Sequence, residues 1–306
     1  MELSQVRYFV GVAETENFTR AAKRCNISQP SLSQQIINLE RELGHRLFHR
    51  LGKRAVLTEA GAAFLGRAKR ILFEVEDAAK ELGDQSALER RITVGAVQTV
   101  MPFLLTDLIA RCRDTHPHLI VSAQEDFRSE LIRAVLEGEL DLAVVPSPVK
   151  DHRVSTEVLL SEPLLLVVGK QHPFASRSEI NVQDLALETF VSLGDSSTLA
   201  AQIREFFGDQ HLQPRIGYRC AQVATLKRYV SKGLGISLLP QLARQPEDAD
   251  SLVYLRLTGS IPTRELMVIR HPQRYQTRGA EQFLALLREH VRQQHGAAPV
   301  PAQPPQ

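Results

Sequence analysis

The sequence has no apolar run that approaches the roughly 18 residues of a membrane-spanning helix. Its first residues, Met1-Glu2-Leu3-Ser4-Gln5, lack the basic segment followed by an apolar segment that marks a signal peptide. The chain of 306 residues contains three cysteines, an odd and widely spaced set that argues against a disulfide framework. These absences predict a cytoplasmic protein without a membrane partner.

Catalytic motifs are also missing. We find no nucleophile elbow, no phosphate-binding loop, no paired metal-binding cysteines and no helical zinc-hydrolase motif. Cys112, His116 and His118 could be imagined as metal ligands, but the proline between the two histidines favours a surface loop. We therefore expect no enzyme, no metal and no cofactor.

The composition is that of a globular protein, with 43% hydrophobic and 24% charged residues, and the length allows two or three domains. The net charge of +2 hides an asymmetry, because residues 1–58 contain nine Lys or Arg against five Asp or Glu. A basic segment at one end suggests an anionic polymer as the partner there. The tail, 296–306, contains four prolines and is predicted to be disordered.

Residues 1–58 are predicted to form short helices. Ser4 is the expected cap of the first helix, and Asn17 or Phe18 opens a second one that ends near Cys25. Asn26-Ile27 forms a tight turn. The third helix is expected to begin at Ser28, with Pro30 in its first turn, and to end at Gly44. This pattern, with small residues Ala21 and Ala22 at the helix crossing, predicts a helix-turn-helix.

The outward face of the third helix carries amide and hydroxyl side chains, including Gln35, which suit base edges in the major groove. Basic residues around Gly52 form a candidate wing that would contact the DNA backbone. The predicted DNA-binding residues are Ser28, Gln29, Pro30, Ser31, Ser33, Gln34, Arg50, Lys53 and Arg54.

Thr58 starts a long amphipathic helix, 59–90, which is a candidate dimer seam; packing against its own chain is the alternative. From Arg91 onward, short apolar strands alternate with helices, which predicts α/β units and a mostly parallel sheet. About 200 residues of this kind could form two lobes with a cleft.

One block of motifs makes a family resemblance specific. Residues 18–22 (FTRAA), 27–36 (ISQPSLSQQI), 43–44 (LG), 47–48 (LF) and 58–61 (TEAG) resemble the signature of LysR-type transcriptional regulators. Residues 233–240 (GLGISLLP) extend the similarity into the second half. Cys25, Gln34 and Arg128 depart from the family pattern, which often has Leu, Arg and a small hydroxyl residue at these positions.

The resemblance implies an N-terminal all-α winged helix-turn-helix (1–58), a long linker helix for dimerisation (59–90), and a C-terminal α/β two-lobed, periplasmic-binding-protein-like effector domain (91–295). Its lobe one would comprise 91–161 and 267–295, and its lobe two 162–266. The implied partners are double-stranded promoter DNA, a small-molecule effector, and the protein itself as a homodimer or homotetramer, with RNA polymerase as a further candidate.

The effector would sit between the lobes, at places where strands end and helices begin. Helix N-termini there favour an anionic ligand, and Arg128 could clamp a carboxylate. For the serines and Thr198, helix capping is the alternative role. The predicted effector-binding residues are Gln98, Thr99, Arg128, Ser129, Ser196, Ser197, Thr198 and Gln222.

The effector segment is most similar to the OxyR-type, peroxide-sensing branch of the family. Thr198 and Phe207 stand where that branch carries its two redox cysteines, so peroxide sensing does not follow from the resemblance. Cys25 and Cys112 are expected in the core. A redox-responsive regulator acting through Cys220 is the alternative function. A solute-binding protein is a third interpretation, against which the helix-turn-helix and the missing signal peptide count.

Overall fold

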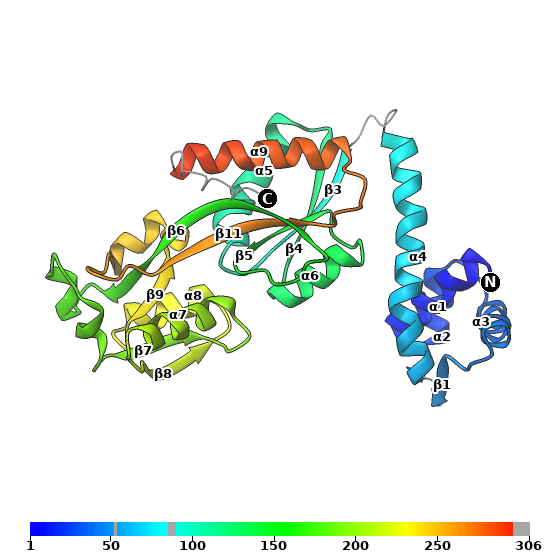
Figure 1. Ribbon diagram of the computed structural model, residues 1–306, viewed down its shortest axis with the longest axis horizontal. Helices are drawn as coiled ribbons and strands as arrows, with labels where there is room; N and C mark the ends of the chain where they lie inside the picture. The colour runs from blue at the N-terminus through cyan, green and yellow to red at the C-terminus, as the bar shows by residue number, and fades with distance from the viewer. Residues whose placement is uncertain (52–53, 85–89, 296–306) are drawn as a thin grey trace. The chain divides into compact units, whose positions relative to one another are not determined.

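The computed structural model describes residues 1–51, 54–84 and 90–295. The chain divides into two compact units, Met1–Ser86 and Ala87–Gln306 (Figure 1). The predicted disordered tail, 296–306, and the end of the predicted linker helix, 85–89, lie outside the described residues.

The first unit contains four helices and a two-stranded wing within its described residues. Its elements are α1 (Leu3–Thr15), α2 (Phe18–Arg24), α3 (Gln29–Leu43), β1 (Phe48–Leu51), β2 (Arg54–Leu57) and α4 (Glu59–Asp84). The Phe9 ring lies at the centre of their core, with centroids 5.3 Å from Phe48 and 5.1 Å from Phe64. Burying these three rings joins α1, the wing and α4 into one unit.

Local capping signals set the ends of these helices. Asn17 accepts hydrogen bonds from the backbone N–H groups of Thr19 and Arg20 at the start of α2. Ser28 does the same for α3, and Gly44 ends α3 in the left-handed conformation at φ 72°. These three predictions are confirmed. The prediction that Ser4 caps α1 is wrong, because the helix begins at Leu3 and its cap is Glu2.

The start of α4 is held against the segment that leads into β1. Thr58 accepts a hydrogen bond from the Gly61 N–H at 3.0 Å and donates one to the Arg46 carbonyl at 2.7 Å. A Cβ atom on Gly61 would overlap the Leu47 carbonyl. Thr58 therefore starts the long helix, as predicted, and Gly61 permits the close approach.

The second unit contains nine strands and five α-helices within its described residues. They are β3 (Arg90–Ala96), α5 (Thr106–Thr115), β4 (Leu119–Glu125), α6 (Arg128–Leu136), β5 (Leu142–Pro146), β6 (Ser155–Gly169), β7 (Thr189–Leu193), α7 (Thr198–Asp209), β8 (Arg215–Cys220), α8 (Val223–Ser231), β9 (Ser237–Pro240), β10 (Leu252–Leu255), β11 (Thr263–Arg270) and α9 (Arg278–His295). Short helical turns complete it at Met101–Leu105, Pro173–Ser176, Val182–Leu185, Gln241–Ala243 (η4) and Pro246–Asp250.

The main sheet has the order β10-β6-β11-β5-β3-β4, with β9 also paired to β6, while β7 and β8 form a separate pair. Strands β3, β4 and β5 are parallel, but β11 runs antiparallel to both β5 and β6, and β6 runs antiparallel to β9 and β10. The prediction of a mostly parallel sheet is therefore wrong. The sheet is mixed because the long strand β6 pairs antiparallel with β9, β10 and β11.

Two hydrophobic cores divide the second unit. The first core lies between β3, β5 and the helices α5, α6 and α9, and the second core lies around β7, β9, α7 and α8. Strands β6 and β11 pass from one to the other (Figure 1). The predicted two-lobed architecture is confirmed by this division.

Candidate DNA-binding surface and ligand cavity

The N-terminal turn of α3 presents exposed polar side chains. Gln29, Pro30 and Ser31 are exposed, and the Ser28 hydroxyl accepts a hydrogen bond from the Ser31 N–H at 3.2 Å. Gln29 makes no side-chain hydrogen bond to any other described residue. Its amide is thus available as both donor and acceptor, as contact with a base edge requires.

Further along α3, only part of the predicted DNA-binding face is exposed. Gln34 is exposed and donates to Asn38, whereas Ser33 is half-buried. Gln35 is half-buried too, and its side-chain oxygen Oε1 accepts a hydrogen bond from the side-chain amide of Gln5 in α1 at 3.0 Å. Gln35 therefore helps to pack α3 on α1, unlike the outward orientation expected from the sequence.

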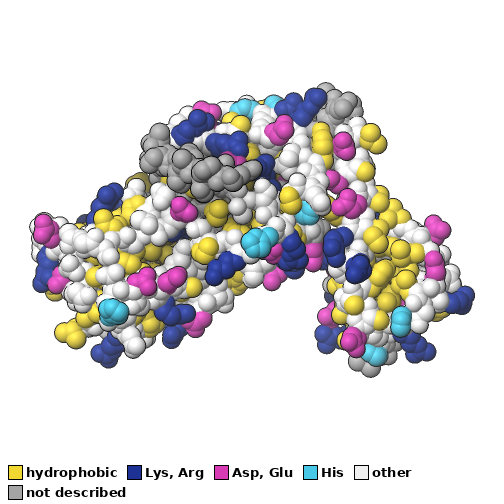
Figure 2. Space-filling model, in the orientation of Figure 1, with side chains coloured by type: hydrophobic (Ala, Val, Ile, Leu, Met, Phe, Trp, Pro, Cys, Tyr) yellow, Lys and Arg dark blue, Asp and Glu magenta, His cyan; other side chains and the backbone are white. Residues whose placement is uncertain are grey.

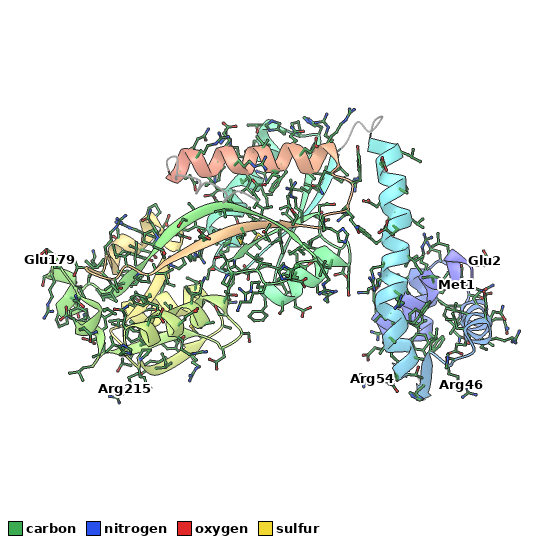
Figure 3. All side chains as sticks on the ribbon, viewed as in Figure 1. Met1, Glu2, Arg46, Arg54, Glu179 and Arg215 are labelled. Atoms are coloured by element: carbon green, nitrogen blue, oxygen red, sulfur yellow. The ribbon has the colours of Figure 1, made fainter. Side chains whose placement is uncertain are left out.

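The wing is a short antiparallel hairpin, with Phe48 paired to Leu57 and Arg50 to Ala55. Arg54 is exposed and forms an ion pair with Glu16 at 2.7 Å. Lys53 and the side chain of Arg50 lie outside the described residues. Figure 3 shows Arg54 and Arg46 at the end of the unit where β1 lies. Arg46 is exposed and has no ion-pair partner among the described residues. It is a further candidate for a phosphate contact that the sequence did not predict.

A cavity of about 170 Å³ lies in the second unit, where the predicted strand ends converge. Its wall is formed by the segments after β3 and β4, the end of β5, and the residues that lead into α7. Six of the eight predicted effector residues line it, namely Gln98, Thr99, Arg128, Ser196, Ser197 and Thr198. Ser129 lines a neighbouring groove that shares Arg128 with the cavity, and Gln222 lines neither.

Two helix N-termini meet at this cavity without side-chain caps. Helix α6 begins after Phe127 and α7 begins after Ser197, and neither of these residues makes a side-chain cap. The N–H groups of a first helical turn lack intrahelical partners, and the helix dipole places partial positive charge there. The capping role that the sequence left open for Ser197 is therefore absent.

The hydroxyl groups of the cavity differ in their partners, because that of Thr99 accepts a hydrogen bond from Arg264 whereas the other three have none among the described residues. Thr99 is 2% exposed and Ser197 is 6% exposed. Neither Ser196 nor Ser197 nor Thr198 forms a side-chain hydrogen bond with another described residue. These three hydroxyls are therefore available to bond to a polar molecule in the cavity.

The charged groups of the lining have both signs. Arg128 donates to the Pro148 carbonyl at 3.0 Å, which leaves most of its five N–H donors free. Asp126 is engaged by the Phe127 N–H at 2.8 Å, whereas Glu125 is exposed and forms no side-chain bond to another described residue. A ligand in the cavity could therefore place a hydrogen-bond acceptor at the helix starts and a hydrogen-bond donor at Glu125.

The apolar residues of the cavity lining were not predicted from the sequence. Val97, Phe127, Pro146 and Leu199 complete the wall. Phe127 is 47% exposed, and nothing in its local sequence marks it as a cavity residue. Such positions are set by the meeting of distant segments rather than by a local pattern.

Two family models match the chain. Residues 3–62 match the bacterial regulatory helix-turn-helix protein, lysR family, and residues 85–292 match the LysR substrate binding domain. The chain belongs to the LysR family of transcriptional regulators. It is a LysR-type DNA-binding regulator with an effector-binding domain, and its relatives are regulators rather than enzymes.

Similar LysR-family proteins include peroxide regulators. The DNA-binding transcriptional dual regulator OxyR of Escherichia coli K12 is 34% identical over 276 residues, which cover 89% of this chain and 90% of the relative. A solved cysteine-to-aspartate variant of full-length OxyR from Pseudomonas aeruginosa has a TM-score of 0.78 at 25% identity and covers 99% of each chain. A cysteine-to-serine variant of OxyR from Corynebacterium glutamicum, bound to hydrogen peroxide, has a TM-score of 0.61 at 26% identity and covers 95% of this chain and 93% of that one.

The cysteines of this LysR-family protein are all free thiols. Cys112 is buried in the first core and Cys25 packs against the core of the first unit, as expected. Cys220 is half-buried, and burial raises the pKa of its thiol. A raised pKa lowers the fraction of thiolate, the form that reacts with oxidants. Phe207 packs edge to face on Phe190 in the second core.

No helix in the described part of the chain has the length and apolar character needed to cross a bilayer.

Proposed function

We propose that this LysR-type regulator binds promoter DNA through α3 and its wing, and that a small carboxylate bound in the cavity controls this binding. The observation that carries the proposal is the cavity itself. Segments far apart in the sequence bring six predicted polar residues and two uncapped helix starts to one space of about 170 Å³. The proposal has three parts, namely DNA contact, self-association and effector binding.

In the DNA complex, α3 enters the major groove with its N-terminal turn first. Gln29, Ser31 and Gln34 contact base edges, while Ser28, Pro30 and Ser33 fit this turn to the groove. Arg50, Lys53 and Arg54 position the unit on phosphates. For Arg54, this requires exchange of the exposed Glu16 ion pair for a phosphate contact, a small cost because exposed ion pairs contribute about 0–1 kcal/mol.

Self-association through α4 would bring together two copies of the DNA-binding helix α3. Hydrophobic side chains gather at the surface along α4 (Figure 2), and Leu82 is 82% exposed. A second copy of this helix is the natural cover for such a stripe. A homodimer, or a homotetramer built from two dimers, would then bind half-sites about 34 Å apart or at a multiple of that spacing. RNA polymerase remains a candidate partner.

The cavity limits the effector in size and chemistry. A cavity of 150 Å³ accepts a molecule the size of benzene, so about 170 Å³ suits a compact ligand. The helix starts, the free hydroxyls and Arg128 favour a carboxylate, and the free carboxylate of Glu125 favours a ligand that also carries a hydroxyl or ammonium group. By preferring one arrangement of the lobes, such a ligand would shift the arrangement of the dimers and hence the DNA contact.

A thermal-shift screen of the full chain tests effector binding. Suitable probes are lactate, malate, serine and salicylate, each compared with the amide in which the carboxylate is replaced. At a concentration about 100 times its Kd, a ligand stabilises the folded protein by about 2.7 kcal/mol. We therefore expect one carboxylate of this kind to raise the Tm of the second unit by about 5 °C or more, and its amide to have no effect.

Ser197→Phe provides the decisive variant, because its ring would fill the cavity. We expect this variant to lose the ligand-induced shift, whereas Ser178→Phe, at an exposed position outside the cavity, keeps it. A shift that survives in Ser197→Phe would place the ligand elsewhere. Failure of every small carboxylate to stabilise the protein would refute a carboxylate effector.

A further inference from the structure

A fully buried ion pair lies in the second unit outside the cavity lining. The side chains of Arg264 and Glu162 are 0% and 1% exposed, and Arg264 Nη2 lies 2.8 Å from Glu162 Oε1. The two residues face each other on the antiparallel strands β11 and β6. Arg264 Nε donates a second hydrogen bond to the same carboxylate oxygen at 2.9 Å.

The pair occupies the junction between the two cores. On β6, Leu160 belongs to the first core and Leu164 to the second, so Glu162 lies between them. Strands β6 and β11 are the two long strands that connect these parts in Figure 1. A change in the geometry of this pair would therefore act where the two lobes meet.

Each member of the pair holds a backbone segment of its own. Arg264 donates from Nη1 to the Thr99 hydroxyl at 2.8 Å and from Nη2 to the Thr99 carbonyl at 3.2 Å. Glu162 Oε2 accepts the Leu242 N–H at 2.6 Å, at the start of the turn η4 that follows β9. The cavity wall and η4 are thus joined through one buried charge pair.

The bond from Arg264 also decides what Thr99 offers to a ligand. One acceptor site of the Thr99 hydroxyl is taken by the guanidinium, and its proton bonds to no other described residue. A hydroxyl that accepts from a cation is polarised and becomes a better donor. Thr99 lines the cavity, so this proton is available to an acceptor inside it.

Stability alone is a weak reason for such a pair. Well-packed apolar residues in place of a buried ion pair are often neutral or stabilising, because both charges lose their hydration on burial. A role in fixing geometry accounts better for its bonds to Thr99 and to the Leu242 N–H, which lie outside the strand pairing of β6 and β11.

We propose that Arg264 and Glu162 are positioning residues of the effector cavity, which hold Thr99 as a hydrogen-bond donor to the ligand carboxylate and join it to the junction of the lobes. This inference rests on the proposed effector function for its ligand. The link between Thr99 and η4 exists without a ligand and can be tested alone.

Hydrogen–deuterium exchange of the full chain tests the link. The N–H groups of Val100 and Met101 bond to the Val97 carbonyl across the turn that contains Thr99, and the Leu242 N–H bonds to Glu162. In Arg264→Lys, a single ammonium group keeps the charge but loses the fork that reaches Thr99. We expect exchange at Val100 and Met101 to quicken about tenfold or more, with Leu242 changed less than about twofold.

A double variant separates the loss of the link from misfolding caused by an unpaired buried charge. Replacing Arg264 and Glu162 together by methionine leaves no unpaired buried charge, and both segments should then exchange about tenfold faster. The matched control is Arg274→Lys, which alters another buried pair, Arg274 with Asp141 at 2.9 Å, within the first core. It should leave Val100, Met101 and Leu242 unchanged.

Two results would overturn the inference. Wild-type exchange at Val100 and Met101 in the folded double variant would show that the pair does not hold Thr99. Equal loss of protection at Leu242 in Arg264→Lys and in the double variant would indicate a merely structural pair. Failure of the carboxylate screen would refute the proposed effector and leave the exchange result standing.

The ligand readout completes the test. For a carboxylate that stabilises the wild-type protein, the double variant should keep the wild-type Tm without ligand to within a few degrees. It should lose about tenfold or more in affinity, because the oriented donor at Thr99 is gone. Unchanged affinity would contradict a positioning role.

Discussion

Replacing Gln29 by glutamate is expected to lower the affinity for DNA about 100-fold or more. The change places a carboxylate on the exposed first turn of α3, where the proposed complex brings base edges and phosphates close. Like charges brought together at an interface cost several kcal/mol, and about 2.7 kcal/mol corresponds to 100-fold in Kd. The fold itself should not suffer, because a negative charge near a helix N-terminus is mildly stabilising.

The measurement is fluorescence anisotropy at one fixed salt concentration, with DNA that the wild-type protein has enriched from a random pool. Fixed salt matters because phosphate contacts make affinity depend steeply on ionic strength. Gln213→Glu is the matched control, since Gln213 is exposed on the second unit and the charge change is identical. If both variants lose affinity equally, net charge rather than α3 governs binding.

Arg264→Met is expected to destabilise the second unit by about 3–5 kcal/mol, since it leaves the Glu162 carboxylate buried without its partner. Urea unfolding, followed by a probe in the second unit, measures this change. The double variant with methionine at both positions should lie within about 1 kcal/mol of wild type or above it. A single variant that unfolds at the wild-type urea concentration would show that water or another donor compensates Glu162.

Local chemistry made the first unit predictable. Asn17, Ser28 and Gly44 act within a few residues of their own position, and their roles as helix caps follow from side-chain reach or from the freedom of glycine. The error at Ser4 has the same origin. Serine is a preferred cap residue, which favoured Ser4, but the cap is Glu2, whose backbone N–H donates a hydrogen bond to the side chain of Gln5.

The sheet was harder to predict because β6 has two halves with different surroundings. Leu164–Val168 is an apolar run of the kind that indicates a buried strand. Residues 155–163 (STEVLLSEP) are largely polar and end in a proline, so they do not stand out as a strand in the sequence. Their partner β11 comes about 100 residues later, and this long-range pairing makes the sheet mixed rather than parallel.

The cavity was predictable at its strand ends and not beyond them. Thr99, Arg128 and Ser197 follow from the rule that parallel α/β units collect functional residues where strands give way to helices. Arg264 and Glu162 carry a weaker signal, namely charged residues that lie close to the apolar runs of β11 and β6. That signal marks them as unusual, but their pairing and their hold on Thr99 arise only from the tertiary structure.

The central claim is that a ligand in the cavity changes contact with DNA. The most direct test measures the affinity of the wild-type protein and of Ser197→Phe for the enriched DNA, with and without the stabilising carboxylate. The account predicts that the ligand changes the wild-type Kd about fivefold or more and leaves the Kd of Ser197→Phe unchanged. A wild-type Kd that does not respond, or the same response in Ser197→Phe, would contradict it.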